Sequence, residues 1–179
     1  MWTLVLDTAT PYLSLGLFRG EAGVGRVKRV ERRHEEVLFG LLEEVLREVG
    51  AGREEIGALV LGEGPGSYTG LRIALAAGLG LAQALGARVF GAGSLLAACW
   101  PYLKEGEPLT PLFTARNGLF YGATYTLEGG RPKEVAPPRK LKATELPREG
   151  RLLLDAPPDP RALYELLPFA HEGVEPLYL

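Results

Sequence analysis

Apolar positions in the first thirty residues follow the pattern of three strands. Thr3–Leu6 is almost wholly apolar, which is typical of a strand buried on both faces. Leu13–Phe18 follows the polar turn Asp7–Pro11, and its leucines at 13, 15 and 17 alternate with Ser14, Gly16 and Phe18. Val24–Val30 has the composition of an edge strand. Glycines between residues 20 and 25 provide the turn between the second and third of these strands. The chain is therefore expected to begin with an antiparallel meander.

A helical stripe of apolar side chains follows, and it ends at Gly50, where a left-handed residue commonly closes a helix. The stripe comprises Val37, Leu38, Leu41, Leu42, Val45, Leu46 and Val49. Strands and helices then alternate: a strand at Ala58–Leu61, a helix at Thr69–Leu85, a strand at Val89–Phe90 and a helix at Ser94–Tyr102. This order of elements is that of a ribonuclease H-like unit, in which parallel strands extend the meander and helices cover its faces.

The pattern restarts after Pro101. It predicts strands at Leu109–Thr114 and Leu119–Thr126 joined by the hairpin signal Arg116-Asn-Gly118, a break at Pro137-Pro138, a strand at Leu152–Leu154 and a helix at Pro160–Leu167. The sequence thus predicts an α/β protein with an actin-like ATPase (ribonuclease H-like) fold of two related halves, the second abbreviated. We place the first half at residues 1–104 and the second, with the C-terminal helix and tail, at 105–179.

Composition narrows the functional classes. Hydrophobic residues make up 46% of the chain, and 20 Lys+Arg against 22 Asp+Glu give a net charge of −2, which does not favour a uniformly basic nucleic-acid surface. The single cysteine, Cys99, excludes a disulfide framework. The longest apolar run, Ile73–Ala82, is too short to span a membrane, and residues 1–7 do not resemble a signal peptide. We expect a cytoplasmic protein without a membrane partner, and the scarcity of Asn and Gln is typical of a thermophile.

The turn at the end of the first strand is one candidate site. In actin-like kinases an Asp and hydroxyl residues at this place hold phosphate through a metal ion and hydrogen bonds. Asp7, Thr8 and Thr10 have this arrangement, so the turn is a candidate vestigial phosphate site. An ordinary Asx turn explains the same residues.

The glycine-rich loop Gly64–Gly70 precedes the second helix. Such a loop at a helix N-terminus binds anions in principle, yet it lacks the lysine of a P-loop. Capping of the helix by Ser67 or Thr69 is the favoured interpretation.

The second helix is apolar on all sides, because Arg72 and Gln83 are its only strongly polar residues after Gly70. A helix of this kind is expected to be covered on both faces. Its small residues and the stripe of the first helix predict an exposed apolar patch for a partner protein, made of His34, Val37, Leu38, Leu41, Leu42, Val45, Gly70, Ala74, Ala77, Gly78 and Leu81. The alternative is that the second half of the chain covers the patch.

Charge patterns elsewhere point to no site. Five basic residues lie between Arg26 and Arg33, but Glu31, Glu35 and Glu36 interleave with or follow them, which favours a solvated face over an RNA groove. Two unrelated histidines and one cysteine form no metal-binding pattern, so we expect no metal site.

Catalytic carboxylates are scarce, since the only aspartates are Asp7, Asp155 and Asp159. An actin-like phosphotransferase needs carboxylates from both halves to hold Mg²⁺, and the second half has Thr114 where one is expected. A ribonuclease needs three or four clustered carboxylates, for which only Asp7, Glu63 and Glu36 are candidates. A serine hydrolase is disfavoured because Ser67 has no histidine base. An ATPase or small-molecule kinase that uses Asp7 is the alternative to a binding function.

Four segments resemble the TsaB (YeaZ) family. They are Leu4-Val-Leu-Asp-Thr-Ala-Thr10, Arg33-His-Glu35, Gly64-Pro-Gly-Ser-Tyr-Thr-Gly-Leu-Arg-Ile73 and the closing Pro176-Leu-Tyr-Leu179. The third is highly specific. The chain departs from the family at Thr114-Ala-Arg116, where an Asp-Ala-Arg hairpin is usual.

The resemblance implies a non-catalytic subunit of the complex that makes N6-threonylcarbamoyladenosine on tRNA, at the adenosine 3′ of the anticodon. It implies a heterodimer with a TsaD homologue through the first two helices, and a TsaE homologue in the assembly. ATP and metal are expected on these partner subunits and none in this chain, which contacts tRNA only through the complex. A homodimer is expected when the chain is alone.

Overall fold

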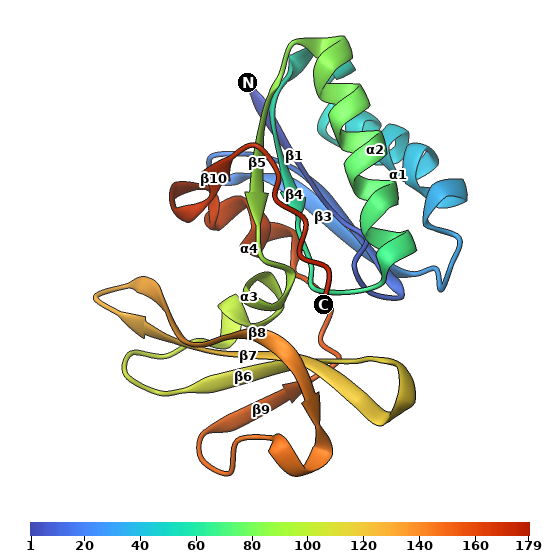
Figure 1. Cartoon of the computed structure of the whole chain (residues 1–179). Helices are drawn as coiled ribbons and strands as arrows, with labels where there is room; N and C mark the ends of the chain where they lie inside the picture. Colours follow the sequence, from blue (N-terminus) through green and yellow to red (C-terminus); the bar gives the residue numbers. More distant parts are fainter.

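The computed structural model describes residues 1–179, arranged around two β-sheets (Figure 1). The first sheet has six strands in the order β10-β5-β4-β1-β2-β3. Their bounds are β1 Trp2–Asp7, β2 Tyr12–Arg19, β3 Ala22–Arg29, β4 Ile56–Gly62, β5 Arg88–Ala92 and β10 His171–Glu172. β1 pairs with β2 antiparallel and with β4 parallel, so the meander and the parallel extension predicted for the first half are confirmed.

Helices cover both faces of the first sheet. α1 (His34–Val49) and α2 (Tyr68–Leu85) lie side by side on one face, and α3 (Ser94–Cys99) and α4 (Pro160–Glu165) on the other (Figure 1). The two-residue period of β1 shows the division, because Leu4 and Leu6 join the core under α1 and α2 whereas Val5 joins the core under α3 and α4. A central strand buried at every position therefore contributes to two cores.

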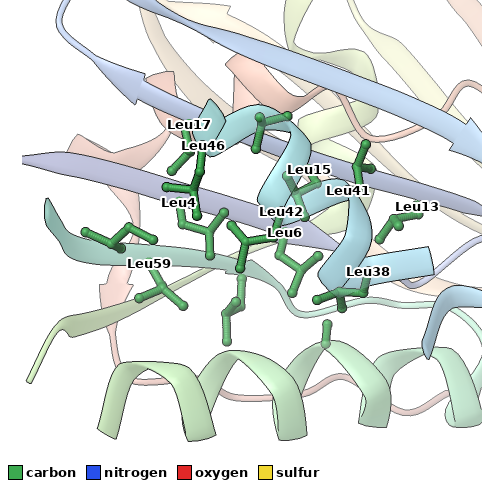
Figure 2. Close-up of a cluster of buried hydrophobic side chains, with 14 of the residues drawn as sticks. Leu4, Leu6, Leu13, Leu15, Leu17, Leu38, Leu41, Leu42, Leu46 and Leu59 are labelled. Atoms are coloured by element: carbon green, nitrogen blue, oxygen red, sulfur yellow. The ribbon is translucent and has the colours of Figure 1, made fainter. Parts of the chain in front are cut away.

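Leucines dominate the core between the first sheet and its two long helices. Figure 2 shows the leucines of α1 pointing toward those of the strands, with α2 closing the cluster from the other side. The strand residues in this cluster include Leu4, Leu6, Leu13, Leu15, Leu17 and Leu59. Each buried leucine side chain contributes about 1.5–3 kcal/mol to folding through removal of apolar surface from water.

The ends of the two long helices have local causes. Ser67 caps α2, because its Oγ accepts a hydrogen bond from the Gly70 amide at 3.2 Å. Both helices end on a left-handed glycine, at Gly50 as predicted and at Gly86. α1 has no side-chain cap at Arg33.

The second sheet repeats the topology of part of the first. Its order is β8-β7-β6-β9, with β6 Leu109–Thr114, β7 Leu119–Glu128, β8 Arg131–Lys142 and β9 Arg151–Leu154. A three-strand antiparallel meander is again extended by one parallel strand, so it matches β3-β2-β1-β4. A single 3₁₀ turn, Ala143–Glu145, stands where the first half has α1. The predicted fold of two related halves with an abbreviated second is confirmed.

Short 3₁₀ segments complete the chain, at Arg53–Glu55, Trp100–Tyr102, Arg116–Gly118 and Leu167–Phe169 in addition to the turn already named. None of the helices combines the length and the apolar character that crossing a membrane requires.

Two sequence predictions about the second half are corrected. Pro137-Pro138 does not break the chain, since β8 runs through it; β8 is an edge strand, where a residue without an amide hydrogen is tolerated. The division at residue 104 also fails at the C-terminus. α4 packs on β1 and β2, and β10 extends the first sheet beside β5, so the end of the chain returns to the first half.

Candidate protein-docking surface

The outer face of α2 is uncovered. α2 contacts β1, β4, β5 and α1, and the second sheet lies at the other end of the molecule (Figure 1). Leu79 on this face is 46% exposed, and Ala76 and Gly80 beside it are exposed too. The second sheet therefore does not cover the helix, and of the predicted second half only the C-terminal tail reaches it, at Tyr68.

A groove of about 380 Å³ runs between α1 and α2. Its lining is Glu35, Leu38, Phe39, Thr69, Arg72, Ile73, Ala76 and Ala77. Phe39 is 44% exposed at its edge, which is a large apolar side chain held in water. The groove has one acidic and one basic side chain, Glu35 on α1 and Arg72 on α2. An apolar groove between two helices with a polar rim has the composition of a protein-docking surface.

Most residues predicted for the interface lie underneath this surface; of the eleven, only Leu38 and Ala77 line the groove. The buried ones are His34, Leu38, Leu41, Leu42, Val45, Gly70, Ala74 and Gly78, and the half-buried ones are Val37, Ala77 and Leu81. The error has a physical cause: the apolar stripe of α1 and the small-residue strip of α2 face their own sheet. The exposed positions one step round each helix, such as Phe39, Ala76 and Leu79, form the surface.

The glycines of α2 show the same division. A Cβ on Gly70 would overlap the carbonyl oxygen of Thr8, and a Cβ on Gly78 would lie 2.7 Å from the Leu61 side chain. A Cβ on Gly80 would meet nothing within 4 Å. Gly70 and Gly78 therefore permit close packing of α2 on its own half, and only Gly80 faces outward.

His34 has a structural place at the first turn of α1. It is 4% exposed, and its Nε2 lies 2.8 Å from the carbonyl oxygen of Thr10 and 3.2 Å from that of Tyr12. Because both neighbours are acceptors, Nε2 carries the proton. His34 thus ties the start of α1 to the β1–β2 turn and does not reach a partner.

The C-terminal tail extends the surface at the start of α2. The rings of Tyr68 and Tyr178 lie 4.9 Å apart, and the guanidinium of Arg72 lies 5.4 Å from the ring centre of Tyr68. Tyr68 is 59% exposed. Aromatic and arginine side chains of this kind are enriched where proteins bind each other.

Glu63 holds that tail in place. Its Oε1 lies 2.7 Å from Nε2 of His171, its Oε2 accepts the amide of Glu175, and its carbonyl oxygen accepts the amide of Leu177 at 2.8 Å. The hydrogen bond to Glu63 raises the pKa of His171. Sequence reasoning missed this role, because more than a hundred residues separate Glu63 from its partners and no local pattern connects them.

The candidate phosphate residues are bonded within the chain. Asp7 is 1% exposed; its Oδ1 accepts the Ala9 amide at 2.9 Å and its Oδ2 accepts Ser94 Oγ at 2.6 Å. Burial raises the pKa of Asp7 to about 6, against the lowering effect of these two bonds. The Ser67 amide donates to the Ala9 carbonyl at 2.9 Å, so the glycine-rich loop closes over the turn.

The two threonines of that turn serve the packing of α2 and the turn itself. Thr8 Oγ1 donates to the carbonyl oxygen of Gly70 and accepts the Ala74 amide at 3.2 Å. Thr10 Oγ1 accepts the Tyr12 amide at 3.2 Å. The hydroxyl groups that would bind phosphate are therefore occupied by backbone groups of the chain.

The end of the second sheet has a carboxylate that sequence reasoning did not place. Asp155 follows β9, and its two oxygens accept the amide of Thr114 at 2.7 Å and the hydroxyl of Thr114 at 2.6 Å. Asp155 therefore closes the ends of β6 and β9. No three His, Cys, Asp or Glu side chains are grouped closely enough to hold a metal ion.

The chain has the two-halved architecture of the actin-like fold, with the outer face of α2 uncovered. The family model described as "TsaD: tRNA N6-adenosine threonylcarbamoyltransferase" matches residues 28–154. The chain belongs to this family, in its TsaB (YeaZ) branch.

Relatives of known sequence and structure agree with this assignment. The chain is 33% identical over 131 residues to the tRNA threonylcarbamoyladenosine biosynthesis protein TsaB of Escherichia coli, a match that covers 70% of this chain and 55% of the relative. It is 24% identical to TsaB of Bacillus subtilis, with 79% and 62% covered. YeaZ from Pseudomonas aeruginosa has the same fold, with a TM-score of 0.87, 99% of both chains covered and 23% identity. The chain spans about half the length of the curated relatives it matches.

Proposed function

We propose that this chain is a non-catalytic subunit in the synthesis of N6-threonylcarbamoyladenosine on tRNA, which binds and organises a TsaD-type catalytic subunit. The observation that carries the proposal is the uncovered apolar face of α2 with the groove beside α1. The names of the curated relatives support the pathway. In this proposal tRNA is modified at the adenosine 3′ of the anticodon, and ATP and metal bind on partner subunits, a TsaE-type ATPase among them.

Two features support docking. Apolar surface that a partner removes from water contributes about 25 cal/mol per Å² to binding. Leu79, Phe39 and Tyr68 are all more than 40% exposed on this one side of the molecule. We expect the same surface to form a two-fold homodimer when the partner is absent, since an isologous contact buries each patch against its copy.

The non-catalytic role is supported by the state of Asp7. An acid buried to 1% exposure and bonded to Ala9 and Ser94 has no free lone pair directed to solvent for a metal ion or a nucleophile. The rival, an ATPase or kinase that uses Asp7, predicts tight binding of Mg-ATP to the isolated chain that is lost in Asp7→Asn. Calorimetry tests this, and such binding would favour the rival.

Leu79→Arg tests the docking surface. Leu79 is 46% exposed on α2 and Leu152 is 47% exposed on β9 of the second sheet, so Leu152→Arg is a control with the same substitution at equal exposure. Leu79→Arg should weaken binding to the TsaD-type subunit at least about tenfold, because it places a charge in a desolvated contact. Leu152→Arg should leave it unchanged.

The measurement is the affinity of the two purified subunits by calorimetry, with the melting temperature of each variant as the check on folding. Equal affinity of Leu79→Arg and wild type would refute docking through α2. If both variants bind and modify tRNA normally in the reconstituted reaction, the proposed surface is wrong.

A further inference from the structure

Two edge strands of this protein are rich in basic residues. β3 bounds the first sheet and β8 bounds the second, so each exposes one side of its backbone. β3 has Arg26, Lys28 and Arg29, and β8 has Arg139, Lys140 and Lys142. The two sets are equal in number; Arg26 is half-buried and the other five residues are exposed.

The basic side chains of β3 are neutralised within the chain. Arg26 pairs with Glu48, Lys28 with Glu44 at 3.8 Å and Arg29 with Glu31 at 2.7 Å. Two of these carboxylates belong to α1, which lies along β3. This explains why the basic segment that begins at Arg26 is a solvated, internally paired face, as the sequence pattern favoured.

The basic side chains of β8 have no such partners. No carboxylate lies within 4.0 Å of the side-chain nitrogens of Arg139, Lys140 or Lys142. The second half lacks a counterpart of α1, because the single turn Ala143–Glu145 replaces that helix, and with it the row of carboxylates is missing. The nearest acidic side chain in sequence, Glu145, accepts the amide of Lys142 at 2.8 Å.

Local charge and geometry then favour a polyanion. Residues 131–151 have seven basic and three acidic side chains, a net charge of +4 in a chain whose total is −2. Lys140 and Lys142 lie on the same face of β8, about 6.6 Å apart along the strand. Lys140 lies 5.9 Å from the ring centre of Tyr121 on β7, which adds an aromatic surface beside the charges.

We propose that the outer edge of the second sheet, at Arg139, Lys140 and Lys142, binds the phosphodiester backbone of RNA. Free cations along the exposed edge of an extended strand, with Lys140 and Lys142 on one face and Arg139 on the other, suit a chain of phosphates, and such contacts position an RNA without reading its sequence. The inference rests on the proposed function for the identity of the RNA as tRNA. It adds that this chain contacts the substrate of the complex directly.

The test compares two triple variants of the full chain. Arg139→Ala/Lys140→Ala/Lys142→Ala removes the free cations, and Arg26→Ala/Lys28→Ala/Arg29→Ala removes the same formal charge from the paired strand. The probe is a fluorescently labelled, unmodified tRNA transcript with adenosine 3′ of its anticodon. Its binding is measured by anisotropy at several salt concentrations, for the chain alone and for its complex with the TsaD-type subunit.

The β8 variant should bind the tRNA at least about tenfold more weakly at 0.1 M salt, and the slope of log affinity against log salt should fall by about 2–3, roughly one per lost phosphate contact. The β3 variant should change affinity less than about twofold. Lys140→Arg/Lys142→Arg should retain wild-type affinity, because the charges remain.

Three outcomes would overturn the inference. Equal loss in both triple variants would show a general charge effect, and no loss in the β8 variant would show that its cations only protect an exposed edge strand from pairing. Loss of the protein complex with unchanged tRNA affinity of the chain alone would assign β8 to a protein partner. Failure of the wild-type chain to bind the TsaD-type subunit contradicts the proposed function and leaves the tRNA measurement on the chain alone as the test of β8.

Discussion

The two glycines Gly70 and Gly80 lie on the same helix and predict opposite effects on stability when changed to alanine. Alanine in a helix is more favourable than glycine by up to about 1 kcal/mol. Gly80 is exposed and its added methyl group would meet nothing within 4 Å, so Gly80→Ala should raise the free energy of unfolding by up to about 1 kcal/mol.

At Gly70 packing outweighs propensity. The added methyl group would overlap the backbone oxygen of Thr8, which cannot turn aside as a side-chain end can. The first turn of α2 would have to move, which strains the two hydrogen bonds of Thr8 Oγ1 to Gly70 and Ala74. Overpacking of this kind costs about 1–3 kcal/mol and sometimes more, so Gly70→Ala should lower the free energy of unfolding by about 2 kcal/mol.

Urea unfolding followed by circular dichroism measures both changes. The two variants should differ by about 3 kcal/mol, and their melting temperatures should differ by roughly 6–12 °C for a chain of this size. A Gly70→Ala variant within about 0.5 kcal/mol of wild type would refute the inference that the small-residue strip packs on its own half. It would favour the opposite orientation, in which the strip faces a partner.

Three further predictions concern buried and titrating groups. Burial raises the pKa of Asp7 to about 6 from an unfolded value of about 3.9, so the contribution of its protonated form to stability is full at low pH and is lost as pH rises through 6. Between pH 4 and pH 7 the stability of Asp7→Asn relative to wild type should therefore rise by about 2 kcal/mol, and a pH-independent difference in urea unfolding would contradict this. The hydrogen bond to Glu63 raises the pKa of His171, so the tail contact is complete below about pH 6.5 and weakens as pH rises through the higher pKa of the folded state. In that pH range, hydrogen exchange of the Glu175 and Leu177 amides should accelerate beyond the intrinsic base-catalysed rate. Glu63→Gln should abolish this extra acceleration. Burial raises the pKa of Cys99 to about 12, so a thiol reagent at pH 8 should label it only at the rate of unfolding, and rapid labelling of the native chain would refute its burial.

The periodicity of apolar residues predicted most elements, because each depends on neighbours in the chain. The leucines of the first meander, the stripe of α1 and the terminal glycines Gly50 and Gly86 are local signals. The strands β6, β7 and β9 of the second half were also readable from residues 109–154, but the third strand of its meander, β8, was not. Pro137-Pro138 was misread because only the sheet order shows that β8 is an edge strand.

The side of each helix that faces solvent required the tertiary structure. The sequence showed that α2 is apolar all round, but a helix of this composition has no internal signal for which strip meets the sheet. The positions of Gly70 at Thr8 and Gly78 at Leu61 decided it, and they turned the predicted interface residues inward. Neighbouring residues, among them Leu79, form the exposed surface instead.

Composition and order along the chain therefore determined the α/β class, the two related halves and the presence of an apolar helix pair. Tertiary structure alone decided which charges are free, where Glu63 holds the tail, and that the C-terminal helix returns to the first sheet. The physical reason is distance along the chain. Periodicity reports contacts within a few residues, whereas an ion pair, a buried carboxylate or a docked tail depends on groups that only the folded chain brings together.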